Sequence, residues 1–528
     1  MKIPRSRAAA AIGEADAMKA QGPDGSPAAP ATASPVLQTS RFGKDVLRLV
    51  SGTALAQLIT VAASPLLTRL FDPQAFGLYF LMGSLTGIIS VVGCLRYEDS
   101  ILLPTTDEGA ANQLTVCLLI SFLVSIVSLA AVRFGGHLIV RVLNAPPALG
   151  ELLWLTPPMV LVSSVALALN YWVTRKRRFA ELSVARVSAS ATSTGIQLTG
   201  GYGGHKTALL LVTSSLIGNV ANTTILGGQT VRRDGQLLRK AVRPAAVWEG
   251  MIRYRKFPLF GTASTLINNV SWELPSLLLQ HYFSAAVVGF YALGNALLRL
   301  PMGIIGGAIS QVFFQRAAEA RRSGALRQVV ESSLQRLAAL SLCPLVVVTV
   351  LGKELFVFVF GSRWSEAGVY AQILAPWIFV WFISSPLSSV FSILERQEFG
   401  LKFNPVVLAT RFLSLAIGGW LHSARLALLL FSAGGVAVYG YYTFAILRAA
   451  GLTIRRTARD LAGNLTLVLP VAAVLLIVKF LKAPGWLAVG SAAVCMLYYG
   501  WQLTRRDPAI IGFLAGAFSG RVRPRGRD

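Results

Sequence analysis

The chain has 528 residues, of which 54% are hydrophobic and only 14% are charged, and its formal net charge is +26. These proportions are far from those of soluble globular domains, so a soluble enzyme or binding domain is excluded as the main part of the chain. The excess of Lys and Arg does not indicate nucleic-acid binding, because the basic residues flank apolar segments and are not interleaved with aromatic residues in a soluble fold.

The N-terminal segment, residues 1–40, is rich in Ala, Pro, Ser and Gly and has no apolar core of the kind that a cleaved signal peptide carries. Such a composition cannot bury enough apolar surface to fold, and it predicts a disordered cytoplasmic arm. The C-terminal segment, residues 505–528, is basic and predicts an exposed cytoplasmic tail.

Between these ends lie fourteen apolar stretches of 18–27 residues, long enough for a helix to cross the hydrocarbon core of a bilayer. They predict an all-α polytopic membrane protein. Their approximate spans are 49–69, 76–96, 113–133, 151–173, 183–201, 207–228, 258–280, 286–312, 329–351, 367–391, 402–420, 426–447, 464–481 and 485–503.

Lys and Arg fall mostly in alternate gaps between these stretches, for example in residues 174–182 and 229–257. Short loops rich in Lys and Arg remain in the cytoplasm, and cationic loops also favour the anionic lipids of the inner leaflet. The pattern therefore predicts a multi-pass protein of the bacterial inner membrane with both termini in the cytoplasm.

The chain is internally duplicated. Gly52-Thr53-Ala54, Pro65 and Phe76-Gly77-Leu78-Tyr79 recur as Gly261-Thr262-Ala263, Pro275 and Val288-Gly289-Phe290-Tyr291, at separations of 209, 210 and 212 residues. An even number of spans separates the copies, so the repeats are parallel and related by an axis along the membrane normal.

The duplication predicts an N-lobe of six helices at 41–228, a basic cytoplasmic linker at 229–257, and a C-lobe of six helices at 258–448. Two further helices follow at 449–504. Transporter sites generally lie between such repeats, near the middle of the membrane.

Two stretches carry a resemblance to a known family. The run Leu67-Thr-Arg-Leu-Phe-Asp-Pro-Gln-Ala-Phe-Gly-Leu-Tyr79 resembles a signature near the first hairpin of Wzx-like oligosaccharide flippases. The run Leu95-Arg-Tyr-Glu-Asp-Ser-Ile-Leu-Leu-Pro104 is similar to a second stretch of that family. The resemblance covers residues 41–505 and implies the fold of the multidrug/oligosaccharidyl-lipid/polysaccharide (MOP) exporter superfamily, which includes the MATE drug exporters.

The resemblance also implies the substrate and the partners. The expected substrate is an oligosaccharide on undecaprenyl diphosphate, moved from the cytoplasmic to the periplasmic leaflet for O-antigen, capsule or exopolysaccharide assembly. Membrane lipids are implied, and a polysaccharide polymerase and a chain-length regulator are the candidate protein partners. No nucleic acid, cofactor or metal is expected.

Three ionisable residues lie far from the ends of the predicted spans: Glu273, Arg299 and Arg411. The two arginines are roughly 13–20 Å from either helix end, too deep to reach water easily. A guanidinium offers paired donors and a permanent charge that suit a diphosphate, so both are candidate residues of a substrate cavity. The alternative is an internal pair with a carboxylate that holds two helices together.

Glu273 precedes Pro275, which removes a backbone hydrogen bond and favours a kink or hinge. A carboxyl that exchanges a proton beside a hinge would couple transport to an ion gradient. The alternative is that Glu273 is the structural partner of a buried arginine.

Four charged residues lie near predicted cytoplasmic helix ends. Arg96 and Arg186 are expected to reach the interface and are weaker candidates for the cavity mouth. Glu98 and Asp99 are expected to form a salt bridge with Arg96 or to act as a cytoplasmic gate. Uncharged polar residues inside the spans contact either sugars or neighbouring helices; they are Gln57, Gln197, Asn219, Asn222, Asn268, Asn269, Asn295 and Gln311.

Enzyme motifs are absent from the sequence. There is no H-E-x-x-H, G-x-S-x-G or intact P-loop, and no large loop that could form a catalytic domain. The four cysteines have no metal-ligand spacing. The remaining alternatives are a MATE-type ion-coupled exporter of small molecules, whose cavity should be more acidic, and a membrane polysaccharide polymerase, which generally has a large periplasmic loop.

Overall fold

The computed structural model describes residues 35–302, 307–396 and 398–508, and these are helical, with no strand in the described part of the chain. Most of the predicted arm and tail lie outside these residues. By its contacts the chain divides into Met1–Lys44 and Asp45–Asp528, and the second unit holds the helical bundle. The prediction of an all-α membrane fold is confirmed.

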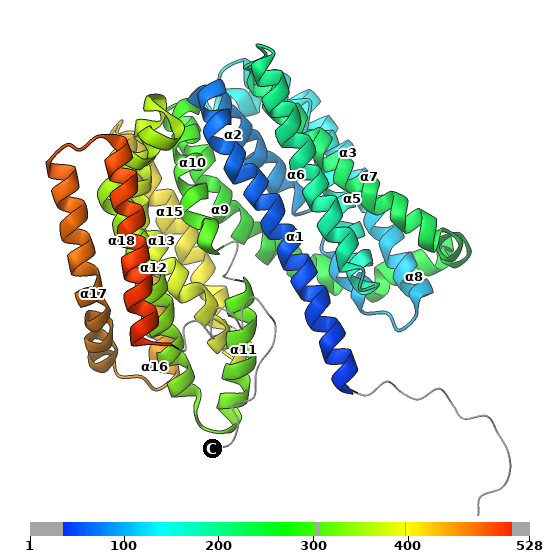
Figure 1. The fold of residues 1–528 in the computed structure, drawn as a ribbon. Coiled ribbons are helices and arrows are strands. Elements are labelled where there is room, and N and C mark those ends of the chain that lie inside the picture. The colour runs from blue at the N-terminus through cyan, green and yellow to red at the C-terminus, as the bar shows by residue number, and fades with distance from the viewer. Residues whose placement is uncertain (1–34, 303–306, 397, 509–528) are drawn as a thin grey trace, which may run out of the picture. The chain divides into compact units, whose positions relative to one another are not determined.

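The N-lobe is built from the first helices of the bundle (Figure 1), which are α1 (Pro35–Leu70), α2 (Pro73–Ser90), α3 (Asp107–Val142), α4 (Ala148–Leu153), α5 (Thr156–Arg175), α6 (Phe179–Tyr202) and α7 (Ala208–Ala241). A 3-10 turn, η1 (Tyr97–Leu102), follows α2. The linker after α7 contains the short helix α8 (Pro244–Arg253) and the π-helical turn η2 (Phe257–Gly261).

The C-lobe follows the same order with α9 (Thr262–Tyr282), α10 (Ala285–Pro301), α11 (Gly307–Arg322), α12 (Leu326–Phe360), α13 (Ser365–Leu387), α14 (Ser389–Ile393), α15 (Glu398–Trp420) and α16 (Ala424–Ala449). The short turn η4 (Ser362–Trp364) precedes α13. The two added helices, α17 (Ile454–Phe480) and α18 (Gly485–Arg506), pack against α12 and against each other (Figure 1).

Repeat-related residues begin the second helix of each lobe. The Asp72 carboxylate accepts a hydrogen bond from the Ala75 amide at 2.7 Å and caps α2, and the Ser284 hydroxyl accepts one from the Val287 amide at 3.4 Å and caps α10. Capping satisfies amide groups that have no partner within the helix. The duplication seen in the sequence therefore extends to the way each helix starts.

The lobes meet where α2 crosses α10, at the end of the bundle that the charge pattern predicts to be extracytoplasmic. A Cβ atom on Gly77 would lie 1.6 Å from the carbonyl oxygen of Ala285, and one on Gly289 would lie 2.3 Å from that of Pro73. Gly77 corresponds to Gly289 in the repeat, and Pro73 corresponds to Ala285. Each contact is therefore the counterpart of the other, as expected for lobes related by a pseudo-twofold axis. Only glycine permits this approach of the two backbones.

Two hydrogen bonds repeat the same symmetry at this end. The indole of Trp364, which follows α12, donates to the carbonyl of Thr68 in α1 at 2.8 Å. The amide of Asn144, which follows α3, donates to the carbonyl of His281 in α9 at 2.9 Å. Trp364 is also fully buried and contributes to a core that draws side chains from both lobes. The lobes are therefore joined at their predicted extracytoplasmic ends.

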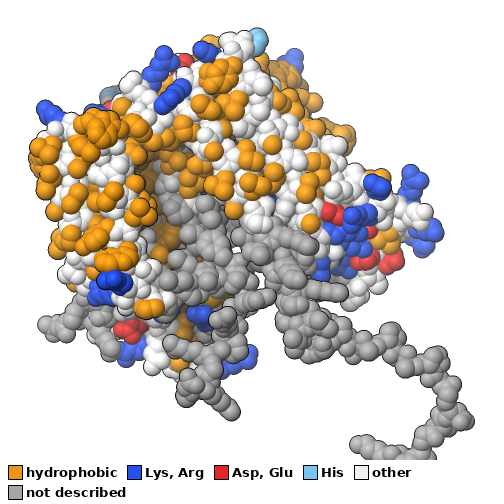
Figure 2. All heavy atoms as spheres, viewed as in Figure 1, with side chains coloured by type: hydrophobic (Ala, Val, Ile, Leu, Met, Phe, Trp, Pro, Cys, Tyr) orange, Lys and Arg blue, Asp and Glu red, His pale blue; other side chains and the backbone are white. Residues whose placement is uncertain are grey.

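Each predicted apolar stretch overlaps at least one helix, and the stretch 286–312 covers α10, residues 303–306 outside the described structure, and the start of α11. Nine helices among the described residues are long and apolar enough to cross a membrane, judged by length and composition. The other five stretches fall on α2, α6, α9, α10 and α18, which are shorter or less apolar, so the number of fourteen spans remains a prediction. Figure 2 shows hydrophobic side chains spread over the flank of the bundle, with Lys and Arg mostly near its ends.

The second predicted stretch, 76–96, is wrong in its last turns. Helix α2 ends at Ser90, and Leu95 and Arg96 adopt left-handed backbone conformations with φ of 48° and 63°. A Cβ atom on Gly93 would lie 1.9 Å from the hydroxyl of Ser164, so the chain turns at a close approach to α5. Arg96 and the acidic residues after it therefore belong to a folded turn and not to a helix end.

The predicted topology can be tested with a reporter enzyme that is active only in the periplasm. Fused after residue 240 or 455, the reporter should be inactive, because these sites follow basic segments predicted to be cytoplasmic. Fused near residue 142 or 360, at the ends of α3 and α12, it should be active. Activity at residue 240 would reverse the orientation of the bundle.

Candidate functional site

Two arginines share one indole ring in the middle of the C-lobe. The ring belongs to Trp272, near the centre of α9. The guanidinium carbon of Arg411, from α15, lies 4.2 Å from the ring centroid, and that of Arg299, from α10, lies 4.4 Å from it. The structure thus brings together two candidates that are 112 residues apart in sequence. An aromatic face attracts each cation through its quadrupole.

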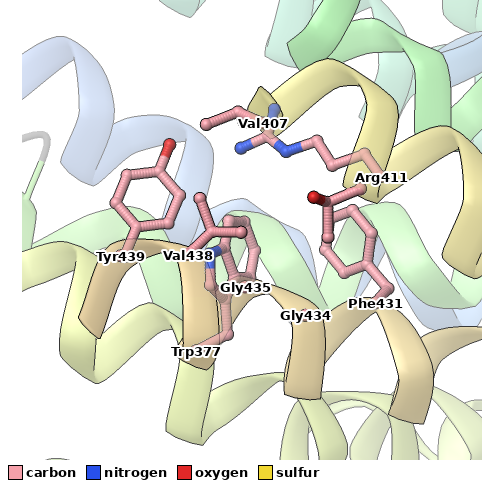
Figure 3. Close-up of a pocket in the computed structure, with 9 residues that line it drawn as sticks. Trp377, Val407, Arg411, Phe431, Gly434, Gly435, Val438 and Tyr439 are labelled. Carbon is pink, nitrogen blue, oxygen red and sulfur yellow. The ribbon is translucent and has the colours of Figure 1, made fainter. Parts of the chain in front are cut away.

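Arg411 is buried. Its Nη1 donates to the backbone carbonyl of Ser271 at 2.6 Å and to the Ser271 hydroxyl at 3.1 Å, whereas its Nη2 has no hydrogen-bond partner. Figure 3 shows the side chain extending from α15 above Trp377, with Phe431 and Tyr439 of α16 on either side. The pocket here has a volume of about 10 Å³, which is of the size needed for one water molecule.

Glycines of α16 make this close packing possible. A Cβ atom on Gly435 would lie 2.1 Å from the ring of Trp377, and one on Gly434 would lie 2.7 Å from the side chain of Thr410. The absence of these side chains lets α16 approach both α13 and α15, and it leaves the aromatic rings against Arg411.

Arg299 differs from Arg411 in its exposure. Its side chain is half-buried, and its guanidinium also lies 5.4 Å from the ring of Trp381. Among the residues that the structure describes, no carboxylate lies within 4.0 Å of Arg299 or Arg411. The interpretation of these arginines as members of an internal carboxylate pair therefore finds no support in the geometry.

Glu273 points from α9 toward the other lobe. Its carboxylate oxygen would lie 3.8 Å from a Cβ atom on Gly87 of α2, and one turn earlier Asn269 donates to the Gly87 carbonyl at 2.9 Å. In the described part of the chain Glu273 has no ion-pair or hydrogen-bond partner. The carboxyl is thus placed at the boundary between the lobes and is not the partner of a buried arginine.

Arg96, Glu98 and Asp99 form a cluster at the predicted cytoplasmic end of α2. Arg96 Nη2 lies 2.5 Å from an Asp99 oxygen, and its Nη1 lies 3.8 Å from Glu98. The Tyr171 hydroxyl donates to the other Asp99 oxygen at 2.8 Å. Glu98 is almost fully buried, and burial raises the pKa of its carboxyl above the ordinary value. The predicted salt bridge is present, and a gating role remains a prediction.

Arg186 lies in the other lobe. Its Nη1 donates to the Thr53 hydroxyl in α1 at 2.7 Å, and it lines a groove between α1, α6 and α7. Arg186 is therefore not part of the cluster formed by Arg299 and Arg411.

The sequence analysis did not identify the tryptophans of the site. Trp272, Trp377 and Trp381 surround the two arginines, yet none was selected as a candidate. A signal was present, because membrane tryptophans concentrate at the two interfaces and Trp272 lies mid-span beside Glu273. A mid-span tryptophan near mid-span arginines favours a cation–π contact.

Residues 66–369 match the family described as "Polysaccharide biosynthesis protein". The chain is 21% identical over 260 residues to the teichuronic acid biosynthesis protein TuaB of Bacillus subtilis (strain 168), and this match covers 49% of the chain and 52% of TuaB. The chain thus spans about half the length of this curated relative.

Two solved structures show the same fold. The lipid II flippase MurJ in an inward closed conformation superposes with a TM-score of 0.65 at 9% identity, covering 87% of this chain and 99% of MurJ. An inward-facing MATE multidrug transporter of the MOP superfamily superposes with a TM-score of 0.61 at 12% identity, covering 77% of this chain and 98% of the transporter. These relatives are membrane transporters and not enzymes. Because the family match covers more than half of the sequence, the chain belongs to the polysaccharide biosynthesis protein family, with the two-lobed fold of the MOP superfamily.

Proposed function

We propose that the chain is a flippase that moves polyprenyl-diphosphate-linked oligosaccharides from the cytoplasmic to the periplasmic leaflet of the inner membrane by alternating access. The product would serve O-antigen, capsule or exopolysaccharide assembly. The observation that carries the proposal is the pair of arginines on Trp272, which have no carboxylate partner among the described residues. Unpaired cations within a membrane are costly and mark the path of an anionic ligand.

The chemistry of a diphosphate fits this cluster. Each guanidinium presents donors in a planar fork, and Arg411 retains a nitrogen without a partner. Arg299 is half-buried and is the accessible member of the pair, whereas Arg411 is held by Ser271 and the surrounding rings. In this assignment Arg299 contacts the phosphate oxygens directly and Arg411 strengthens the positive potential behind it. Two arginines without a carboxylate partner in the described structure would repel an organic cation, so the site does not suit an exporter of cationic small molecules.

Alternating access requires the lobes to separate at the end where they now meet. The separation would break the contacts of Gly77 with Ala285 and of Gly289 with Pro73, and the hydrogen bonds of Trp364 and Asn144. These contacts are local and involve few polar groups, so they can be broken while each lobe moves as a rigid body.

The proposal is tested by deleting the gene. The deletion strain should lose surface polysaccharide and accumulate the lipid-linked oligosaccharide on the cytoplasmic side, where added glycosidase cannot reach it in intact spheroplasts. Complementation with the gene should reverse both effects. Normal polysaccharide in the deletion strain, together with increased sensitivity to cationic drugs, would favour a MATE-type exporter.

Glu273→Gln is expected to slow transport and to remove its dependence on external pH. The reason is that glutamine imitates only the protonated carboxyl, so a proton-coupled step at the lobe boundary would no longer respond to the gradient. Protein level should be unchanged, because no described arginine is paired with Glu273. The measurement is transport in vesicles with an imposed proton gradient. Transport by the variant that stays full and pH-dependent would eliminate the coupling role.

A further inference from the structure

A polar groove with a volume of about 410 Å³ lies in the N-lobe, away from the arginine cluster of the C-lobe. It is formed by one face of α1 together with α6 and α7. Its lining is composed of amides, hydroxyls, one guanidinium and two alanines: Thr53, Ala56, Gln57, Thr60, Arg186, Ala189, Ser190, Asn219 and Asn222. No acidic residue contributes to it.

Three amides of the groove are not used for holding helices together. The side chains of Gln57, Asn219 and Asn222 have no hydrogen-bond partner among the described residues, and the Asn222 Oδ1 atom is itself buried. Other amides of the bundle behave differently. Asn112 donates to the Ala241 carbonyl at 3.1 Å, and Asn269 bridges the two lobes. Asn112 and Asn269 thus form hydrogen bonds between helices, whereas the three groove amides form none in the described part of the chain.

Unpaired amides within a membrane bundle are unfavourable for the free protein. The buried Oδ1 atom of Asn222 carries a desolvation cost that no hydrogen bond from the described residues offsets, and polar groups in a membrane face a cavity and not the lipid. Because most of the lining side chains are half-buried, they remain within reach of a ligand. The groove is therefore built for a partner that supplies hydrogen bonds.

The repeat gives a second argument. Helices α1, α6 and α7 correspond in order to α9, α15 and α16 of the C-lobe. Arg186 lies near the start of α6 and Arg411 lies deeper in α15, so the two arginines are not at equivalent positions. Around Arg411 the pocket is aromatic, with Trp377 and Phe431, whereas around Arg186 it is lined by amides and hydroxyls. The equivalent helices of the two lobes therefore carry different linings, aromatic in one and rich in amides and hydroxyls in the other, which suits two chemically different parts of one ligand.

We propose that this groove is the glycan subsite of the transporter, and that Gln57, Asn219 and Asn222 form hydrogen bonds with the hydroxyl groups of the sugar. The assignment rests on the proposed function. An amide offers both donors and acceptors, which matches neighbouring sugar hydroxyls. A site built to bond a hydroxyl rejects ligands that lack it, because its own polar groups are then left unpaired. With one guanidinium and no acid, the groove suits a glycan without cationic groups.

The test compares two lipids that differ only in the glycan. One is the polyprenyl-diphosphate-linked oligosaccharide extracted from membranes of the deletion strain, and the other is undecaprenyl diphosphate. The purified full-length protein in nanodiscs should bind the glycosylated lipid more tightly. The double variant Asn219→Ala/Asn222→Ala should lose about tenfold or more for that lipid, since two hydrogen bonds are removed. Its affinity for undecaprenyl diphosphate should not change.

The matched control is Gln229→Ala. Gln229 is also on α7 and has a buried Oε1 without a partner, but it does not line the groove. This variant should bind both lipids as the wild type does. The thermal midpoint of the ligand-free double variant should stay unchanged or rise, because unpaired amides are being removed. A lower midpoint would instead indicate a structural role and overturn the assignment.

The remaining outcomes separate the two proposals. Equal affinity of the wild type for both lipids, or an equal loss for both in the double variant, would overturn the glycan subsite alone. Failure of the wild type to bind either lipid would overturn the proposed function and the subsite with it.

Discussion

Alanine at Arg299 or at Arg411 is expected to lower the amount of surface polysaccharide by about 10- to 100-fold. Arg299→Ala removes a hydrogen bond to a charged group, which contributes about 1.5–3 kcal/mol, and about 1.4 kcal/mol corresponds to a factor of ten. Arg411→Ala removes the positive charge behind the site, whose attraction for the diphosphate is strong away from water. The measurement is polysaccharide at the cell surface in the deletion strain complemented with each variant, normalised to the protein level in the membrane.

The two positions should differ in stability. Arg411→Ala removes two hydrogen bonds to Ser271 and the contacts with three aromatic rings, so the thermal midpoint of the purified protein should fall. Arg299→Ala should change it little, because Arg299 is half-buried and makes only ring contacts in the described structure. Lysine at position 299 keeps the charge and should restore part of the transport, but lysine at position 411 cannot reproduce the planar fork.

Arg425→Ala is the matched control for both. Arg425 is also in the C-lobe, but it is exposed and pairs with Glu366, and exposed pairs contribute little to stability. Its loss should leave polysaccharide unchanged. Normal polysaccharide in both Arg299→Ala and Arg411→Ala, at wild-type protein level, would show that neither residue handles the diphosphate.

Alanine at Gly77 or at Gly289 is expected to abolish transport while the protein still inserts. The new Cβ atom would lie 1.6 Å from the Ala285 carbonyl oxygen in the first case and 2.3 Å from that of Pro73 in the second, so α2 and α10 must move apart. Overpacking of this kind typically costs about 1–3 kcal/mol. The cost falls on the state in which the lobes are joined at this end, and the population of that state should decrease.

The shift in population can be measured by cross-linking. Cysteines at positions 144 and 281, which lie next to each other because the Asn144 side-chain amide donates to the His281 carbonyl, should be linked by a short bis-maleimide in the otherwise wild-type protein and less so with Gly77→Ala. Gly83→Ala is the matched control, since a Cβ atom on Gly83 of the same helix meets no atom within 4 Å. Full transport and unchanged cross-linking in both Gly77→Ala and Gly289→Ala would contradict the crossing described for α2 and α10.

The sequence was sufficient for the all-α, two-lobed membrane fold because the signals are long or repeated. Apolar stretches placed the helices, and the recurrence of the segment around Gly77 at Gly289 predicted two parallel lobes. That these two glycines form the contact between the lobes was not predicted. The end of α2 was misplaced because nothing in the run after Ser90 looks less apolar; the turn depends on contact between Gly93 and Ser164, which lies on another helix.

The site was only half predictable for a similar reason. Arg299, Arg411 and Glu273 were identified by their depth within the predicted spans. Depth alone does not predict which of these side chains lie close together. Trp272 brings the two arginines together while Glu273, the next residue, points to the opposite lobe. That division follows from helix geometry, in which successive side chains point in different directions, combined with tertiary packing that no local pattern specifies. The groove around Arg186 likewise depends on three helices that are distant in sequence.

The central claim is that this protein moves a lipid-linked oligosaccharide across a bilayer through a path lined by Arg299 and Arg411. The most direct measurement is translocation in proteoliposomes, with lipid-linked oligosaccharide from the deletion strain and a membrane-impermeant glycosidase that detects molecules reaching the outer leaflet. The account predicts translocation by the wild type that is absent from protein-free liposomes and strongly reduced by Arg299→Ala. Translocation no faster than in protein-free liposomes, with correctly inserted protein, would contradict it.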